Sequence, residues 1–498
     1  MMHDDGQSDR SVVPQKPPNK AVGPAAEAEE GRDRAKGNSR ECNAPRTQGR
    51  IGVSSGLERV RQVASRDRRQ RFTALLHHVY AGERLRAAYL ALKRDAAAGI
   101  DGETWRHYGE RLEANLQDLA GRLQRGAYRA HPVRRTYIPK ADGRQRPLGV
   151  PALEDKLVQR AVGEVLDAIY DTDFLGFSYG FRPGRSPHDA LNALAAGLLT
   201  QKVNWVLDAD IRSFFDTREH GWLGKFLEHR VADRRVVRLI QKWLNAGVLE
   251  DGERTCSEVG TVQGGSISPL LANLYLHYGC DLWVHWCRQT QAKGDGVVVR
   301  FADDCVVGFQ HRPEAERFLA ALRERFAKFG LALHPDKTRL LEFGPVADRN
   351  RRGRGQGKPE TFNFVGFTHI CGQTRRGRFT VLRQTVRRRL QAKLHEVKAE
   401  LRRRRHFPIP EQGAYVRAVG GGHLRYFGVP MNGPAIRLFR QEVGRLWHQE
   451  LSRRSQTPCL PWRRMTRFIT RWLPPARICH PYPLVRLGVV TQGRSRMQ

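Results

Sequence analysis

The sequence has no apolar run of about 18 residues or more, and this absence argues against a membrane-spanning helix. Its first residues, MMHDDGQSDRSVVPQ, have no apolar core, so we expect no signal peptide. None of its eight cysteines is part of a Cys-x-x-Cys pair, the spacing typical of zinc sites. We therefore expect a cytoplasmic protein whose cysteines are reduced and hold no zinc.

Acidic residues are also few, because 51 Asp and Glu stand against 86 Lys and Arg. The net charge is +35 over 498 residues, and the excess is spread along the chain. A field of this sign attracts polyanions, and nucleic acid is the partner that it favours. A solvated basic surface without a partner is the alternative.

Composition divides the chain into four predicted parts. Residues 1–66 are rich in Gly, Pro, Ser and Gln, which predicts a disordered basic tail. Helical and strand-like patterns then alternate over 67–380, basic helices follow over 381–475, and 476–498 form a short C-terminal segment. The first basic helix has an apolar stripe at helical spacing: Val386, Leu390, Leu394, Val397 and Leu401.

Four local patterns in the second part predict the elements that surround its polar motifs. A hairpin over 134–151 has the cationic tip KADGRQR, and a buried strand covers 204–209. A Gly-rich loop leads into a helix that opens at Ser268-Pro269, since Pro suits a helix start. A second hairpin, VVVRFADDCVVGF, covers 297–309.

Two carboxylate motifs follow apolar strands. In DADIRSFFD the strand runs into Asp210, and in VVVRFADDCVVGF the adjacent Asp303 and Asp304 separate two apolar runs. Buried carboxylates without partners are destabilising, and neighbouring ones raise each other's pKa. Such a site is favourable where divalent cations supply the missing charge, and Mg²⁺ prefers oxygen ligands. A solvated Asp-Asp turn is the alternative, but the apolar legs of the hairpin argue against it.

A series of motifs extends from about Arg71 to about Arg486, over four fifths of the chain. In order they are AAAGIDGETW, YIPKADGRQRPLGVP, SYGFRPGRSPHDAL, DADIRSFFD, QGGSISPLLANLYL, RFADD, HPDKT, FNFVGF, GGGHLRYFGVP and HPYPLVR. The series resembles group II intron-encoded reverse transcriptases/maturases, from the N-terminal extension and fingers hairpin through polymerase motifs A to D to the thumb, or maturase X domain. The resemblance implies an α+β fold. This is a right-hand polymerase whose fingers and palm carry the catalytic aspartates on an antiparallel sheet, with an α-helical thumb.

The same resemblance implies the catalytic metal ligands. Asp210 matches motif A, Asp303 and Asp304 match motif C, and Ile211 would offer a backbone carbonyl. Two Mg²⁺ ions are implied, with Mn²⁺ as a substitute. Because adjacent side chains of an extended strand face opposite ways, we expect the mechanism to depend on Asp303, whereas Asp304 needs a turn that swings it inward. Two nearby carboxylates are interpreted as structural: Asp208 and Asp216.

Further positions match residues that bind the incoming dNTP in the family. Lys140 and Arg146 correspond to the fingers cations that hold the triphosphate, with a solvated basic turn as the alternative. Phe215 corresponds to the bulky residue that excludes a 2′-hydroxyl, with ordinary core packing as the alternative. Gln263 corresponds to the motif B residue near nucleotide and template. Lys337 corresponds to the motif D lysine that protonates pyrophosphate, although an isolated lysine favours a surface interpretation.

The basic helices after residue 384 resemble the thumb that grips intron RNA. Cations there would contact phosphates, and aromatic rings could stack on unpaired bases, although helix packing is the stronger expectation for each ring. The predicted nucleic-acid-binding residues are Arg387, Arg388, Lys393, Arg402, Arg403 and Tyr426. Four further aromatics belong to the same prediction: Phe427, Trp447, Trp462 and Trp472.

The resemblance predicts an RNA-directed DNA polymerase that copies its intron RNA from a DNA 3′ end and assists intron splicing. The implied partners are intron RNA, an RNA template with a DNA primer or target, and dNTPs; a homodimer is left open. No Cys/His-rich endonuclease module follows the thumb, which resembles the bacterial members that lack it, acting in the cytoplasm at the nucleoid. The alternatives are a splicing maturase without polymerase activity and a reverse transcriptase recruited for defence.

Overall fold

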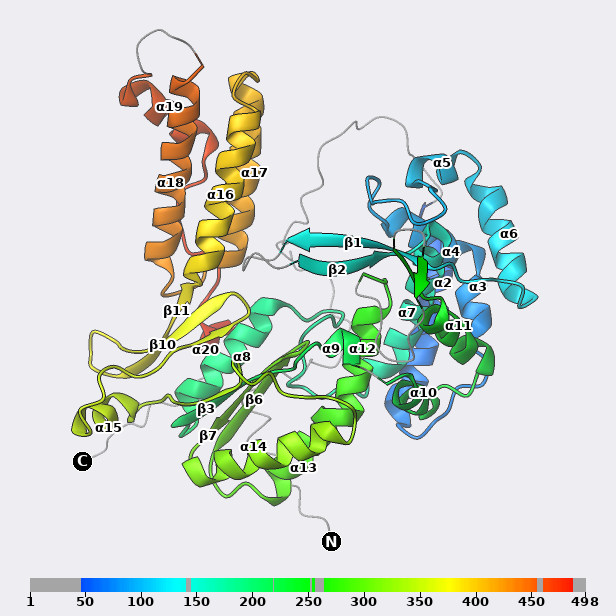
Figure 1. Cartoon of the computed structure of the whole chain (residues 1–498), viewed down its shortest axis with the longest axis horizontal. Helices are drawn as coiled ribbons and strands as arrows, with labels where there is room; N and C mark the ends of the chain where they lie inside the picture. The colour runs from blue at the N-terminus through cyan, green and yellow to red at the C-terminus, as the bar shows by residue number, and fades with distance from the viewer. Residues whose placement is uncertain are drawn as a thin grey trace.

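The computed structural model describes residues 46–139, 145–217, 219–250, 253–255, 264–454 and 460–486. Helices and three sheets alternate along the chain, so the predicted mixed α+β class is confirmed (Figure 1). The pairings within the sheets are antiparallel except for one short parallel pairing between β1 and β4. In the described ranges, no helix is long and apolar enough to span a membrane.

An N-terminal group of helices forms one side of the molecule. Its members are α2 (Arg46–Arg66), α3 (Leu76–Tyr80), α4 (Gly82–Ala91), α5 (Trp105–Glu110), α6 (Leu112–Gln124) and α7 (Leu153–Tyr170). They pack around α7, whose side chains are buried along most of its length. This helix has so few exposed positions because α2, α3, α4 and α12 all contact it.

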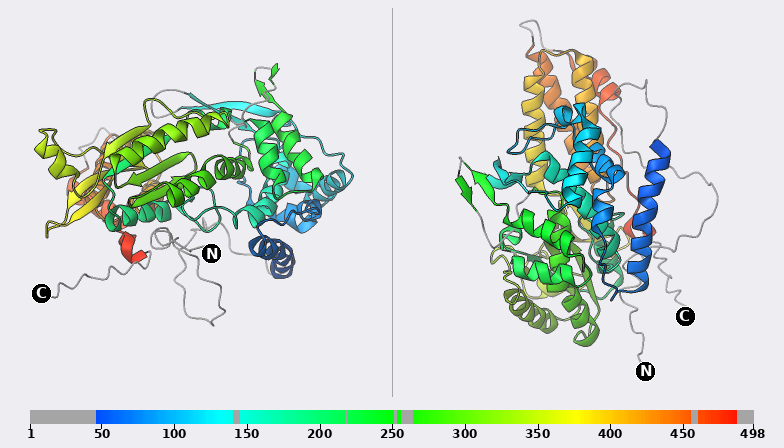
Figure 2. Two further views of the ribbon diagram at one scale, coloured as in Figure 1. Left: turned by 90° about the horizontal axis from the view of Figure 1, so that it is seen from below. Right: turned by 90° about the vertical axis from the view of Figure 1, so that its right-hand side faces the viewer.

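Helix α2 corrects the prediction that residues 1–66 are disordered throughout. Leu57, Val60 and Ala64 recur at helical spacing and pack against the core, and Figure 2 shows α2 in dark blue at the edge of the N-terminal helices. The polar average of the segment concealed this narrow apolar stripe. Residues 1–45 of the predicted tail lie outside the described residues.

Arg230 fixes the C-terminal end of α2. Its guanidinium donates to the carbonyls of Ala64, Asp67, Arg68 and Gln70 at 3.1, 3.3, 2.9 and 3.1 Å. It also pairs with both oxygens of Asp173 at 2.6 and 2.8 Å, and only 2% of its surface is exposed. The last carbonyls of a helix have no partner within the helix, so one buried cation satisfies them here.

The predicted hairpin over 134–151 forms one arm of a four-stranded sheet, which we call the hairpin sheet. β1 (Val133–Pro139) pairs antiparallel with β2 (Gln145–Val150), and β1 also pairs with β4 (Val248–Glu250), which pairs with β5 (Glu253–Thr255). Helices α10 (His220–Glu228) and α11 (Arg234–Asn245) lie below this sheet in Figure 1.

The central sheet has the order β6-β7-β3-β8, and all its pairings are antiparallel. Its strands are β3 (Trp205–Asp210), β6 (Gly296–Phe301), β7 (Asp304–Phe309) and β8 (Arg339–Glu342). The predicted second hairpin is therefore confirmed as β6–β7. Alternate residues face opposite sides: Val298 and Val307 belong to the larger core, whereas Val297 and Val299 belong to a second one.

Different layers cover the two faces of the central sheet. On one face lie α13 (Leu282–Thr290) and α14 (Arg312–Ala327). α13 continues from α12 (Ser268–Leu276) through a π-helical turn at His277–Asp281. On the other lie α8 (Pro187–Thr200) and a small sheet of β9 (Phe362–Phe364), β10 (Phe367–Gln373) and β11 (Phe379–Thr385). Short helices α9 (Phe214–Thr217) and α15 (Ala347–Gly353) complete this region. Because both faces are covered, the strands themselves are nearly all apolar.

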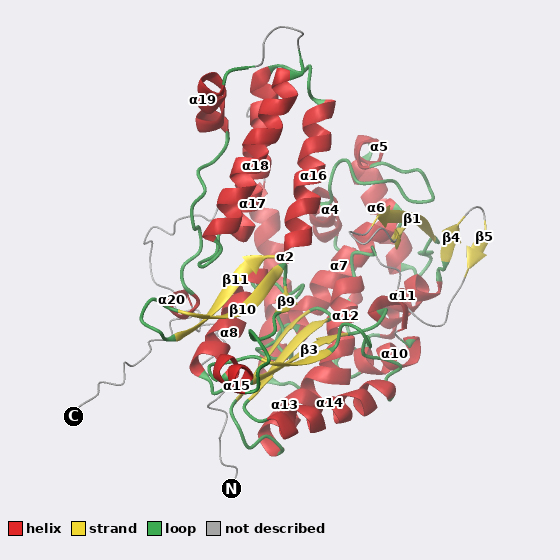
Figure 3. Ribbon diagram, turned by 60° about the vertical axis from the view of Figure 1, so that its left-hand side comes forward, coloured by secondary structure: helices red, strands yellow, loops and turns green. Residues whose placement is uncertain are grey.

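The C-terminal helices form a bundle with its own core above the small sheet (Figure 3). They are α16 (Arg387–Arg403), α17 (Ile409–Phe427), α18 (Gly433–Ser452) and α19 (Trp462–Trp472). The predicted stripe is confirmed, since Leu390, Val397 and Leu401 are buried in this core and Leu394 packs against it. β11 pairs with β10 as far as Thr385, so the small sheet ends a few residues after the boundary predicted near residue 380.

After α19 the chain returns to the central layers. His480 stacks on His188 with ring centroids 3.9 Å apart, and Arg486 of α20 (Pro483–Arg486) donates to Asp189 at 3.0 Å. His188 and Asp189 lie in the first turn of α8. The predicted C-terminal segment therefore ties the bundle to the layer beneath it.

Replacing Arg230 by Ala is expected to destabilise the protein by about 3–5 kcal/mol, since it leaves Asp173 buried without its partner. Urea unfolding followed by tryptophan fluorescence measures the loss. Arg106→Ala is the matched control, because Arg106 and its partner Asp95 are 79% and 87% exposed. A change for Arg230→Ala as small as that of the control would contradict the role assigned to Arg230.

Candidate active site

Three aspartates meet at one end of the central sheet. Asp210 is the last residue of β3 and Asp304 the first of β7, and the two are direct partners in the antiparallel register. Asp303 lies in the turn that precedes β7. Directly opposed residues of neighbouring strands have their Cβ atoms about 5 Å apart. The predicted convergence of motifs A and C is therefore a consequence of strand pairing.

A strained turn sets the direction of the paired aspartates. Ala302, which precedes them, has a φ of +57°, a left-handed conformation that non-glycine residues rarely adopt. Phe301 and Asp304 pair across this turn, so the hairpin is as tight as the chain allows. Asp303 therefore lies in a two-residue turn, with Asp304 already in β7.

The loop at 178–181 supports the turn from outside. A Cβ atom added at Gly180 would lie 2.3 Å from the backbone nitrogen of Ala302, so only glycine permits this approach. Asn273 of α12 holds the loop in place, because its amide donates to the carbonyl of Gly180 at 2.6 Å. Next to Gly180, Phe181 is 54% exposed with a φ of +57°, and its ring lies 6.4 Å from that of Phe301.

Arg300 connects these segments. Its guanidinium donates to both oxygens of Asp281 at 2.7 and 2.5 Å and to the Ala302 carbonyl at 2.8 Å. It also donates to Asn273 Oδ1 at 3.2 Å and to Ser178 Oγ at 2.7 Å. Arg300 and Asp281 are each 1% exposed. One buried cation thus joins β6, the π-helical turn, α12 and the loop at 178 to the turn that carries Asp303.

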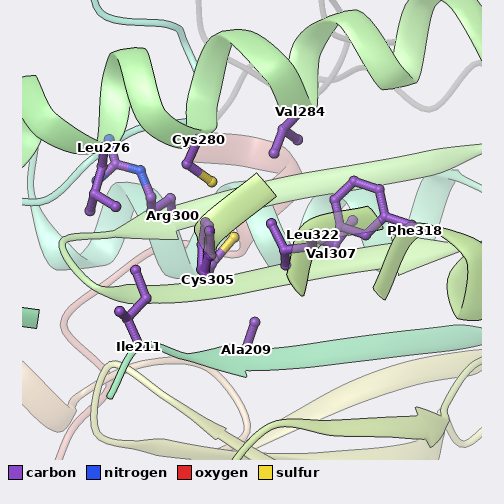
Figure 4. A pocket seen from close by; sticks show the side chains of 11 residues that line it. Ala209, Ile211, Leu276, Cys280, Val284, Arg300, Cys305, Val307, Phe318 and Leu322 are labelled. Atoms are coloured by element: carbon purple, nitrogen blue, oxygen red, sulfur yellow. The ribbon is translucent and has the colours of Figure 1, made fainter. Parts of the chain in front are cut away.

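A small pocket lies directly behind the turn, between the central sheet and the helices on its face (Figure 4). Side chains of Cys280 and Cys305 point into it, together with apolar groups from β3, β7 and α14. Burial raises the pKa of the Cys305 thiol to about 12, so this thiol stays protonated and packs as an apolar group. Closely packed, mainly apolar side chains therefore lie behind the turn.

Negative charge accumulates around Asp304. Its side chain reaches the solvent, but the protein around it excludes much of the water and raises its pKa to about 7, with added repulsion from Asp303, Asp210 and Asp208. Burial also raises the pKa of Asp208 to about 6. Arg339 lies 3.7 Å from Asp208, which fits the prediction that Asp208 is structural.

Lys337 is drawn to the same centre. Its Nζ lies 2.6 Å from Asp210 Oδ2, and the loop that carries it lies next to the end of β3 in space. The backbone nitrogen of His334 donates to the Asp210 carbonyl at 2.8 Å, and Leu333 pairs with Ile211 in an isolated bridge. The side chain of Ile211 is buried, so only its backbone could serve as a ligand.

The aspartates fit a divalent cation as an incomplete set of ligands. Among the described residues, no group of three or more His, Cys, Asp or Glu side chains is arranged to hold a metal ion. Mg²⁺ keeps several waters and takes further ligands from substrate phosphates, so it needs few protein ligands. Asp210, Asp303 and Asp304 are the side chains that would hold it, because their mutual repulsion is what a cation relieves.

The predicted dNTP-binding residues are described only in part. Arg146 lies in β2 and Phe215 in α9, but their side chains are not described, and the side chain of Asp216 in α9 is not described either. Lys140 and Gln263 lie outside the described residues. A Cβ atom at Gly264 would lie 2.4 Å from the carbonyl oxygen of Gly149 in β2. The loop after Gln263 therefore contacts the strand that carries Arg146.

The predicted nucleic-acid-binding cations of the bundle fall into two groups. Arg387, Arg388 and Arg402 are exposed on α16. Lys393 and Arg403 lie on the same helix but pair with Glu396 and Glu400 at 2.7 and 2.6 Å.

The aromatic residues of the bundle mostly follow the packing alternative. The ring of Tyr426 packs against Phe367 and Phe427, and its hydroxyl donates to the Val365 carbonyl at 3.0 Å. Trp447 is fully buried and donates to Gln412 at 2.9 Å. Among the aromatics of this prediction, Trp462 is exposed, at 52%.

The sequence interpretation missed the residues that hold the turn: Arg300, Asn273, Asp281 and Ser178. A signal was present, because Arg300 interrupts the apolar run VVVRF at a position where the hairpin is buried. A charge in such a run needs a buried partner. That partner, Asp281, lies 19 residues earlier in the chain.

An antiparallel sheet that presents aspartates from adjacent strand ends, beside a helical bundle with basic faces, is typical of a nucleic-acid polymerase. Residues 138–369 match the family model for reverse transcriptase (RNA-dependent DNA polymerase). This segment resembles a reverse transcriptase domain, and it contains β2, β4 and β5 of the hairpin sheet, the central sheet and all three aspartates.

Similar proteins from other organisms make this assignment more specific. The chain is 40% identical over 191 residues to protein YkfC of Escherichia coli, covering 38% of this chain and 50% of YkfC. It is 35% identical over 222 residues to the group II intron-encoded protein LtrA of Lactococcus lactis, covering 44% of this chain and 37% of LtrA. A 91 kDa protein in the cob intron of Schizosaccharomyces pombe is 43% identical over 146 residues, 29% of this chain and 18% of that protein. The chain thus matches half or less of the length of each of these relatives. The predicted resemblance to group II intron reverse transcriptases/maturases is confirmed.

Replacing Arg300 by Ala is expected to destabilise the protein by about 3–5 kcal/mol, because Asp281 stays buried without a partner. Arg312→Ala removes an exposed pair with Glu316 and is the control, with an expected loss under about 1 kcal/mol. The double variant Arg300→Met/Asp281→Leu separates folding from positioning. It should recover most of the stability but still bind Mn²⁺ more weakly than the wild type. Wild-type Mn²⁺ affinity in the double variant would contradict the positioning role.

The raised pKa of Asp304 predicts a pH dependence of stability in the metal-free protein. The folded state takes up this proton near pH 7, but the unfolded chain only near its ordinary pKa of 3.8, so lowering the pH from about 8 to about 6 stabilises the fold. The solvent exposure of Asp304 limits the gain to about 1 kcal/mol. Urea midpoints in EDTA should show this rise for the wild type and a flatter profile for Asp304→Asn. Parallel profiles would contradict it.

Proposed function

We propose that the protein is an RNA-directed DNA polymerase encoded by a group II intron, with maturase activity in intron splicing and retrohoming. The observation that supports this most directly is the register of β3 and β7, which opposes Asp210 and Asp304 within a reverse transcriptase domain. In this assignment the central sheet is the palm, the hairpin sheet and N-terminal helices are the fingers, and α16–α19 are the thumb. The proposed domains are 46–385, which includes α2, and 386–475, with 476–486 packing against α8.

The proposed reaction is nucleotidyl transfer to a DNA 3′-hydroxyl opposite an RNA template. Two Mg²⁺ ions, or Mn²⁺ in their place, would activate the hydroxyl and stabilise the leaving pyrophosphate. Asp210, Asp303 and Asp304 hold the positive charge in place, with the Ile211 carbonyl beside them. Lys337, whose Nζ lies 2.6 Å from Asp210 Oδ2, would donate a proton to the leaving pyrophosphate.

The remaining positions are proposed to select and hold the incoming dNTP. Lys140 and Arg146 of the hairpin contact the triphosphate, and Gln263 contacts nucleotide and template. Phe215 lies below the sugar and excludes a 2′-hydroxyl. The close approach of Gly264 to Gly149 supports this grouping, since it puts the Gln263 loop against the hairpin.

Intron RNA is the proposed partner of the thumb. Arg387, Arg388 and Arg402 are exposed on one basic helix and suit phosphate contacts. Lys393 and Arg403 contribute if they leave their exposed glutamate partners. Tyr426 we assign to packing at the base of the thumb, because its hydroxyl and ring already have protein partners. The ribonucleoprotein would act in the bacterial cytoplasm, at the nucleoid when the target is DNA.

A splicing maturase without polymerase activity is the second candidate. It would not require the aspartates that meet at the strand ends, and the support given to their turn by Arg300 argues for a working polymerase. Intron RNA domains flanking the gene would distinguish both from a reverse transcriptase recruited for defence.

Asp303→Ala is expected to lower primer extension on an RNA template by roughly 10³-fold or more, since a lost metal contact is worth several kcal/mol. RNA binding should be unchanged. The control is Glu316→Ala, which removes a half-exposed carboxylate from α14 and should extend primers normally. Undiminished incorporation by Asp303→Ala would overturn the mechanism, and splicing rescue by the same variant would show that the maturase role is separable.

A further inference from the structure

Helix α11 has a sharply divided surface on the outer side of the fingers. Its buried side consists of four apolar residues: Val236, Val237, Leu239 and Ile240. The opposite side exposes Arg234, Arg238 and Gln241 at helical spacing. α11 lies away from the ends of β3 and β7 in Figures 1 and 3, so this face is separate from the candidate active site.

Two shallow hollows flank this face, and both include Arg238 and Gln241. The first also includes Arg71 and Arg234, with Glu228 as the one carboxylate among its lining residues. The second also includes Arg129 and Lys242, and its lining residues include no carboxylate. A stretch of surface about 18 Å long, the length of the helix, is therefore lined by cations.

The cations of this face, like Arg387, Arg388 and Arg402 of α16, differ from the surface arginines that pair with a carboxylate of their own helix. In the described part of the chain, Arg71, Arg129, Arg234 and Arg238 have no carboxylate within ion-pair distance. By contrast, other surface arginines pair within their own helices: Arg312 with Glu316, Arg352 with Asp348 and Arg445 with Glu442. Like charges one helical turn apart, such as Arg234 and Arg238, repel each other. The face thus accumulates positive charge that the protein does not neutralise.

We propose that this face, which we call the α11 surface and define by Arg71, Arg129, Arg234 and Arg238, binds the phosphate backbone of a folded RNA. Guanidinium groups match phosphate oxygens in a bidentate manner. This inference rests on the proposed function, because it gives the intron RNA a second contact outside the thumb and away from the copied strand.

The surroundings specify the kind of RNA. No aromatic residue lines either hollow, so the surface offers no platform on which unpaired bases could stack. Double-stranded RNA is recognised mainly by shape and backbone contacts, which a row of cations provides. An anionic membrane is a poorer match, because the exposed large apolar side chains of the described residues lie elsewhere.

The test compares two full-length triple variants with equal loss of charge. Arg71→Gln/Arg234→Gln/Arg238→Gln removes cations from the α11 surface, and Arg106→Gln/Arg312→Gln/Arg352→Gln removes arginines that already have partners outside the thumb. The probe is a labelled RNA hairpin of about 20 base pairs. Its affinity is measured by fluorescence anisotropy between about 50 and 200 mM salt.

The α11 variant is expected to bind the hairpin at least about tenfold more weakly at low salt, with a salt slope reduced by about 2–3. The control variant should keep the wild-type slope. Equal slopes for the two variants would overturn the inference, and so would a loss confined to anionic phosphatidylserine vesicles.

Primer extension on a short RNA template separates this inference from the proposed function. The α11 variant should extend primers at the wild-type rate, since its substitutions lie outside the catalytic centre. A wild-type protein that extends no primer would refute the polymerase assignment, while the hairpin titration would still decide whether the α11 surface binds RNA. Loss of extension together with unchanged hairpin binding would overturn the inference and place these arginines on the template path.

Discussion

The buried ion pair between Arg300 and Asp281 is the constraint on which the candidate active site depends. Taking two charges out of water is unfavourable unless their hydrogen-bonding groups are satisfied, and here the guanidinium reaches partners in four chain segments. One of those bonds holds the carbonyl of Ala302, whose left-handed conformation aims the following aspartates. Strain at a functional site persists only where the surroundings enforce it. Arg300 is the group that enforces it in this fold.

Charge is distributed in a way that suits a polymerase. Carboxylates gather at one end of the central sheet, where repulsion raises the pKa of Asp304, and cations cover the thumb helix and the α11 surface. A divalent cation relieves the first accumulation, and a nucleic-acid backbone neutralises the second. Lys337 serves the centre as a counter-ion from the protein itself. The clustered carboxylates and the clustered cations therefore both match a complex of nucleic acid with divalent cations.

The sequence was most informative where the pattern is local. The hairpin over 297–309, the apolar stripe of α16 and the strand that ends at Asp210 follow from periodicity alone. It was least informative where distant segments meet. Asp304 depends on Gly180 and Asn273, and the helix hidden in residues 46–66 depends on Arg230, more than 160 residues away.

A crystal structure with an RNA template, a DNA primer, Mg²⁺ and a non-reactive dNTP analogue tests the central claim most directly. The account predicts Mg²⁺ bound by Asp210, Asp303 and Asp304, with Lys337 released from Asp210. It also predicts that Arg300 keeps its bonds to Asp281 and Ala302, so that the turn is the same with and without substrate. Metal bound elsewhere, or a turn rebuilt with the Arg300 contacts broken, would contradict it.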